Sequence, residues 1–118
     1  MKAEVKRFHS PDIVDLENFQ PDNENSFSFL LQVIVGIKDV ESEESFDMVV
    51  CTPQWMQNNH SESEMIFGEH YLIVFKFDFN EIRKKVSNYI DQLEEENWDL
   101  LANKIDRIGK WEFRDYQE

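Results

Sequence analysis

The chain has few of the residues that mark several protein classes. Its 118 residues include one cysteine, three glycines and three prolines. A single cysteine cannot form a disulfide within the chain, so nothing points to an oxidising compartment. The three glycines stand far apart, which excludes a glycine-rich phosphate-binding loop. Apolar runs are also short, because none approaches the roughly 20 residues that span a bilayer. The opening segment MKAEVKRFHS lacks the apolar centre of a signal peptide, and we expect a soluble, cytoplasmic protein.

Basic residues are scarce too. Twenty-five acidic residues against twelve basic ones give a net charge of −13. A field of that sign repels nucleic acids and anionic membranes and attracts cationic partners. The same charge also suits a small protein that only has to stay soluble, and composition leaves both explanations open.

Enough apolar residues are present for a packed core, since 41% of the chain is hydrophobic and 14% is aromatic. Period-two alternation predicts strands at 3–8, 27–39, 46–52 and 69–77. In the last of these, the pattern predicts that Tyr71, Ile73, Phe75 and Phe77 share one face. Gly36, late in the second strand, predicts a bulge or bend.

The period then changes to that of a helix. Asp78 and Asn97 are suited to cap two helices, and Gly109 fits the left-handed position that ends many helices. Strands first and helices last predict an α+β protein, with C-terminal helices packed on one face of an antiparallel sheet. We find no internal repeat and no linker, so we expect a single domain over residues 1–118.

The segment VVCTPQWM, residues 49–56, raises the question of a nucleophile. A catalytic cysteine needs a nearby base and a lowered pKa, and a strand position in an acidic chain supplies neither. We therefore expect Cys51 to be a packed residue at a strand end, where Pro53 stops the pairing. Trp55 would then anchor the following turn.

Other chemistry is weakly indicated. His60, Glu62 and Glu64 alternate in a polar segment and can hold a metal, but a solvated acidic loop explains them better. No H-x-x-x-H pattern, calcium loop or catalytic constellation is present. We therefore expect a binding protein that is not an enzyme and has no cofactor.

Three segments carry a resemblance to a known family: FSFLLQVIVGIKDVESEESFDMVVCTPQWM, HYLIVFKFDFNEIRKKVSNYI and NWDLLANKIDRIGKWEFRDY. In this order, over most of residues 27–116, they resemble the immunity proteins of bacterial polymorphic toxin systems, in particular the family called immunity protein eight. The CTPQWM element and the closing WEF are the most specific parts. The resemblance implies a small α+β protein, encoded beside a toxin as in contact-dependent growth inhibition, that neutralises this toxin in the producing cell.

The partner that the resemblance implies is the C-terminal domain of the toxin, which we expect to be basic and which is in many such systems a nuclease. Acidic side chains are suited to a cationic active site and speed association with it. Our candidate toxin-binding face comprises six carboxylates of two acidic connections: Asp39, Glu41, Glu43, Glu44, Glu62 and Glu64. Ordinary solvated turns remain an alternative for these residues. The alternative functions are an acidic adaptor or nucleic-acid mimic, and a hydrolase that uses clustered carboxylates or a metal.

Overall fold

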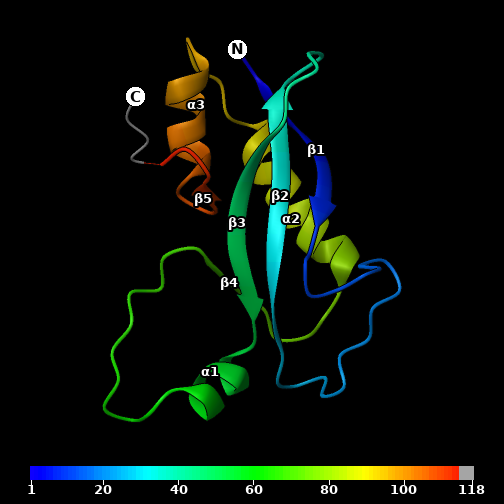
Figure 1. Ribbon diagram of the computed structural model, residues 1–118, viewed down its shortest axis with the longest axis vertical. Coiled ribbons are helices and arrows are strands. Elements are labelled where there is room, and N and C mark those ends of the chain that lie inside the picture. The colour runs from blue at the N-terminus through cyan, green and yellow to red at the C-terminus, as the bar shows by residue number, and fades with distance from the viewer. Residues whose placement is uncertain (115–118) are drawn as a thin grey trace.

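Two long strands joined by a hairpin form the centre of a mixed, five-stranded sheet (Figure 1). The computed structural model describes residues 1–114, so the last four residues of the predicted domain lie outside the described chain. In chain order the elements are β1 (Ala3–His9), β2 (Ser28–Ile37), β3 (Glu44–Cys51), α1 (Pro53–Asn59), β4 (Tyr71–Ile73), α2 (Phe79–Asp91), α3 (Trp98–Ile105) and β5 (Lys110–Trp111). None of the helices in this range has the length and apolarity to cross a membrane.

The sheet has the strand order β1-β2-β3-β4, and β5 also pairs with β3. One edge of β3 is therefore shared: its last three residues pair with β4, and Phe46 and Asp47 pair with β5. The α+β class is confirmed, but the sheet is not wholly antiparallel, because β4 runs parallel to β3. The reason is the connection, since α1 and a long loop carry the chain back beside Val49, from where β4 runs in the same direction as the end of β3.

The strand predicted at 69–77 is much shorter in the structure, although Tyr71 and Ile73 do lie on the face opposite to Leu72. Only Tyr71–Ile73 form β4, and Leu72 lies opposite Val50, which is fully buried. Parallel pairing thus places Leu72 on the core face and turns Ile73 outward, where it is 48% exposed. Phe75 lies beyond the end of β4 and is 80% exposed. Alternation along an apolar run shows which residues share a face but not which face the helices will cover.

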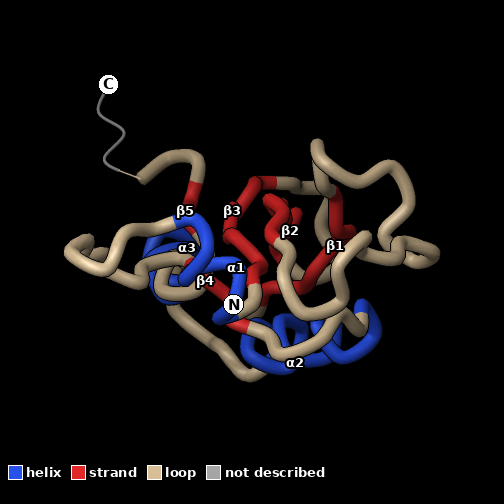
Figure 2. Tube along the Cα trace, turned by 90° about the horizontal axis from the view of Figure 1, so that it is seen from below, coloured by secondary structure: helices blue, strands red, loops and turns tan. Residues whose placement is uncertain are grey.

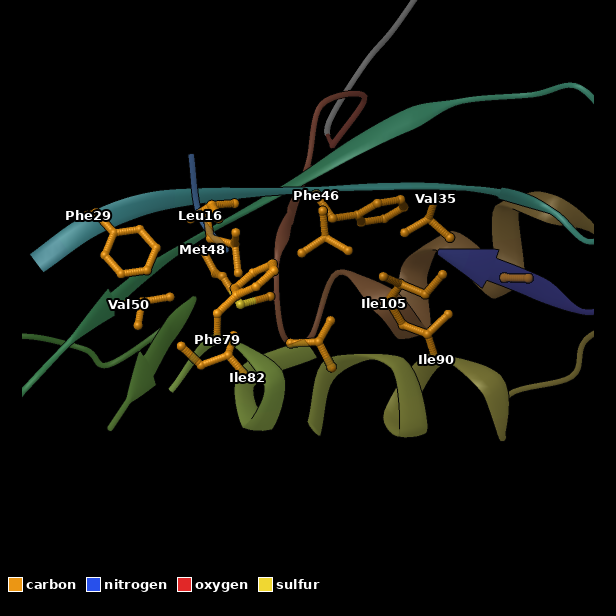
Figure 3. Close-up of a cluster of buried hydrophobic side chains, with 14 of the residues drawn as sticks. Leu16, Phe29, Val35, Phe46, Met48, Val50, Phe79, Ile82, Ile90 and Ile105 are labelled. Carbon is orange, nitrogen blue, oxygen red and sulfur yellow. The ribbon is translucent and has the colours of Figure 1, made fainter. Parts of the chain in front are cut away.

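The core lies between one face of the sheet and the helices α2 and α3. Figure 2 shows α2 along this face, and Figure 3 shows the side chains that fill the space between them. Alternate residues of β2 point into it, as the period-two pattern predicts. The fully buried side chains of the core cluster are Leu31, Val33, Val35, Phe46, Val50, Ile90, Leu101, Ala102 and Ile105.

Both predicted N-caps are confirmed. The carboxylate of Asp78 accepts a hydrogen bond from the backbone N–H of Glu81 at 3.2 Å, and the side chain of Asn97 accepts one from Leu100 at 3.0 Å. Each satisfies a donor that the first turn of a helix leaves unpaired. Gly109 does not have the predicted left-handed conformation, because no glycine in residues 1–114 has a positive φ. Its backbone instead approaches Phe46 so closely that an added Cβ atom would lie 3.1 Å from it.

The segment after β3 is a short helix and not the predicted turn. The buried hydroxyl of Thr52 accepts a hydrogen bond from the backbone N–H of Trp55 at 3.2 Å and caps α1. Pro53 occupies the first helical turn, where its missing N–H costs nothing. The same hydroxyl accepts a second hydrogen bond, from the backbone N–H of Phe27, at 3.3 Å. Thr52 therefore fixes both the end of β3 and the start of α1.

Candidate functional site

The hairpin patch consists of the four predicted carboxylates that lie in and next to the β2–β3 connection: Asp39, Glu41, Glu43 and Glu44. Two of them are bonded within the chain. Glu43 forms an ion pair with Arg7 at 3.1 Å, and Glu44 accepts a hydrogen bond from the indole Nε1 of Trp111 at 3.0 Å. Asp39 and Glu41 are exposed, and their carboxylates have no bonding partner among residues 1–114. Half of this patch is therefore available to a partner.

The loop patch consists of Glu62 and Glu64, in the connection between α1 and β4. Glu64 accepts a hydrogen bond from Nδ1 of His60 at 2.7 Å, and this bond lowers the pKa of Glu64 below its ordinary value of 4.5. Glu62 is exposed and has no bonding partner within the described chain. One carboxylate of the pair thus shapes the loop, while the other is free to meet a partner.

The structure does not bring all six carboxylates together. The hairpin patch lies at one end of β3, and the loop patch follows α1 beyond the other end (Figure 1). They form two separate acidic patches, because the strand that separates them is eight residues long. A partner that covers one patch need not reach the other.

His60, Glu62 and Glu64, which the sequence offered as a less favoured metal site, are not among the three-ligand groups of the described residues. The cluster that the described residues do form is Glu69, His70 and Asp106, whose ligand atoms lie within 4.8 Å of one another. The guanidinium of Arg114 binds Glu69 at 2.6 Å and lies 3.4 Å from Asp106. His70 donates from Nε2 to the backbone carbonyl of Asp106 at 2.6 Å. These contacts clamp the start of β4 to the end of α3, with a guanidinium as the cation between the carboxylates.

Cys51 is fully buried, as the sequence predicts. Burial raises the pKa of its thiol, which is the reverse of what a nucleophilic cysteine needs. The thiol is a packed group at the end of β3. In the segment VVCTPQWM, Cys51 ends β3, Thr52 caps α1 and Pro53 begins it.

Sequence reasoning missed a group of exposed apolar residues. Met65 is 94% exposed, Ile66 is 42% exposed and Phe67 is 96% exposed. The three stand side by side in the loop between the acidic residues and β4. The available signal was a short apolar run with neither helical nor strand period, followed by Gly68 and preceded by polar residues.

Comparison with known proteins gives one family. The model of the family described as Immunity protein 8 matches residues 3–116, nearly the whole chain. No curated protein and no solved structure matches.

Proposed function

This chain belongs to the immunity protein 8 family, and from that premise we propose that it binds the C-terminal domain of its cognate toxin and covers the active site or substrate surface of that domain. An immunity protein acts against a toxin, so the family itself supplies a toxin as partner. Immunity proteins of this kind are generally not enzymes. Neutralisation then takes place by binding, in the cytoplasm of the producing cell, as in contact-dependent growth inhibition.

The observation that supports direct binding is the supply of exposed carboxylates with no partner inside the chain. Asp39, Glu41 and Glu62 have this property, on a chain whose net charge is −13. A solvated carboxylate gains more from a cationic partner than one that is already in an ion pair. The toxin domain that suits such a surface is basic, as a nuclease is, because it has to hold an anionic substrate.

The test is co-expression with the C-terminal domain of the large secreted protein encoded beside this chain. We expect cells that express the domain alone to stop growing, cells that also express this chain to grow, and the two proteins to co-purify. Growth arrest that this chain does not relieve contradicts the proposal. Charge reversal at all six predicted carboxylates should weaken binding, and unchanged binding would remove both acidic patches from the interface.

An acidic adaptor or nucleic-acid mimic gives a different result. It should bind basic proteins in general, such as lysozyme and cytochrome c, with a steep dependence on salt. An immunity protein should prefer one toxin domain over these controls at physiological ionic strength. Comparable binding to all of them would favour the adaptor.

A further inference from the structure

Three consecutive apolar residues stand out on the surface of this acidic protein. Met65 and Phe67 keep 94% and 96% of their surface exposed, and Ile66 lies between them at 42%. A single exposed apolar residue is ordinary, but a run of large ones with nothing packed on it marks an interaction surface. We name residues 61–69 the projecting loop, because the chain leaves the body of the protein here between α1 and β4 (Figure 1).

The projecting loop is held at its first end. His60 and Glu64 are joined by a hydrogen bond of 2.7 Å, and the backbone N–H of Glu64 donates to the carbonyl of Ser61 at 3.1 Å. Asn59, the last residue of α1, donates from its side chain to the carbonyl of Trp55 at 2.9 Å. The turn that leads into the apolar residues is therefore closed before any partner arrives.

The second end is held as well. Glu69 binds the guanidinium of Arg114 at 2.6 Å, and His70 donates to the carbonyl of Asp106 at 2.6 Å. The carbonyl of His70 in turn accepts the backbone N–H of Val49 at 2.9 Å. A loop fixed at both ends loses less conformational freedom on binding than a loose one, which favours affinity.

Acidic residues lie on both sides of the apolar run. Glu62 and Glu64 precede it and Glu69 follows it, and residues 61–69 contain no lysine or arginine. The surface complementary to this arrangement is an apolar hollow with a cationic rim. An anionic membrane is a poor match, because these carboxylates are repelled by it. A second copy of this chain is also a poor match, since it carries the same charge of −13.

We propose that the projecting loop enters a hollow of the toxin domain, where Met65 and Phe67 are the apolar anchors and Glu62 meets a cationic rim. This inference rests on the proposed function and adds to it the element that makes the contact. Truncation of a central anchor residue commonly removes a large share of the binding free energy, whereas neighbouring contacts contribute little. The hairpin patch, at the other end of β3, lies outside this contact.

The experiment compares the double variant Met65→Ser/Phe67→Ser with Val14→Ser. Val14 is another fully exposed apolar residue, in the loop between β1 and β2. Figure 1 shows this loop beside the β1 edge of the sheet, whereas the projecting loop lies beside the β4 edge. All three side chains are exposed, so we expect both variants to unfold at the same urea concentration as the unsubstituted chain. Affinity for the C-terminal toxin domain is measured by calorimetry, and protection is measured by growth.

We expect the double variant to bind the toxin domain roughly thirtyfold more weakly or worse, and Val14→Ser to bind within about twofold of the unsubstituted chain. Wild-type affinity in the folded double variant overturns the inference and leaves the proposed function intact. If the unsubstituted chain neither binds nor protects, both fail together. A dimer of the unsubstituted chain that the double variant loses, with toxin binding kept, would assign the loop to self-association and also overturn the inference.

Discussion

The backbone of Gly36 lies directly against the carbonyl group of Ser42, across the connection between β2 and β3. A Cβ atom added at Gly36 would lie 2.8 Å from the carbonyl carbon of Ser42 and nearer still to its oxygen. The hydroxyl of Ser42 also accepts the backbone N–H of Ile37 at 2.9 Å, which closes the hairpin end. The glycine is therefore required by close approach. We expected a bulge or bend at Gly36, and the register shift that the β1–β2 pair shows lies in β1, between Val5 and Arg7.

This contact makes Gly36→Ala the first prediction. The added methyl group has to displace backbone and not a flexible side chain, so we expect the free energy of unfolding to fall by about 2 kcal/mol or more. Urea denaturation followed by circular dichroism measures the change. Gly68→Ala is the matched control, because nothing lies within 4 Å of a Cβ atom there and its φ is not positive. Its effect should stay within about 0.5 kcal/mol. Equal stability of the two variants would show that the hairpin end adapts freely.

The second prediction concerns Cys51. The thiol is fully buried and burial raises its pKa, so a thiol reagent should not modify the folded protein at neutral pH. Full modification should appear once urea has unfolded the chain. Cys51→Ser places a hydroxyl in the apolar site and should destabilise the fold more than Cys51→Ala does. Both folded variants should still bind the toxin domain. Rapid labelling of the native protein, or lost binding at full stability, would return Cys51 to a functional role.

The local parts of the fold could be predicted from the sequence, and the non-local parts could not. Asp78 and Asn97 were identified as caps because capping depends on residues three positions apart. The direction of β4 depends on how a distant segment returns to β3, which no local pattern encodes. For the same reason, the sequence indicated six acidic candidates but not that β3 keeps Glu41 and Glu62 apart.

The apolar anchors were missed for a different physical reason. An apolar residue in a sequence indicates burial, because most large apolar side chains are buried. Whether another element covers it is decided by packing. Phe75 and Phe67 were both open to this error, and the structure leaves both exposed. A functional surface of this kind can be recognised only in a structure that shows which apolar residues the core buries.

The third prediction is a pH dependence at the clamp between Glu69 and Arg114. Their hydrogen bond lowers the pKa of Glu69 below its ordinary value of 4.5. The unfolded chain therefore binds a proton at a higher pH than the folded chain does. The stabilisation is complete above the ordinary value and is lost as the pH falls through the lowered pKa of the folded state. Glu69→Gln should flatten the acid side of a plot of urea midpoint against pH.

Arg114→Gln provides the check on that assignment, because it removes the cation and leaves the carboxylate. Either substitution alone should flatten the acid side, and the effects should be less than additive in the double variant, since the two groups share one contact while Arg114 also lies 3.4 Å from Asp106. Exposed ion pairs are weak, so the comparison rests on the shape of the pH curve and not on the absolute stability. Fully additive effects of Glu69→Gln and Arg114→Gln would show that the two groups act separately.

The fourth prediction separates the two acidic patches by a charge-matched pair of variants. Glu62→Lys and Glu41→Lys each change the net charge from −13 to −11, and both residues are exposed without a bonding partner in residues 1–114. If the projecting loop makes the contact, Glu62→Lys should slow association with the toxin domain several-fold at low salt. Glu41→Lys, at the far end of β3, should have a much smaller effect. Stopped-flow measurements at two salt concentrations give the association and dissociation rates of each variant.

The salt dependence of the rates distinguishes a local contact of Glu62 from the electrostatic field of the whole protein. A general effect of charge slows the association of the two variants equally. It disappears at high salt, because charges are screened beyond a Debye length of roughly 8 Å at physiological ionic strength. A local contact leaves a difference between the variants in the dissociation rate, because Glu62 lies next to Met65 and Phe67 in the bound state that we propose. Slower association and faster dissociation for Glu41→Lys alone would move the interface to the hairpin patch, since only a partner seated on that patch would be held by the carboxylate of Glu41.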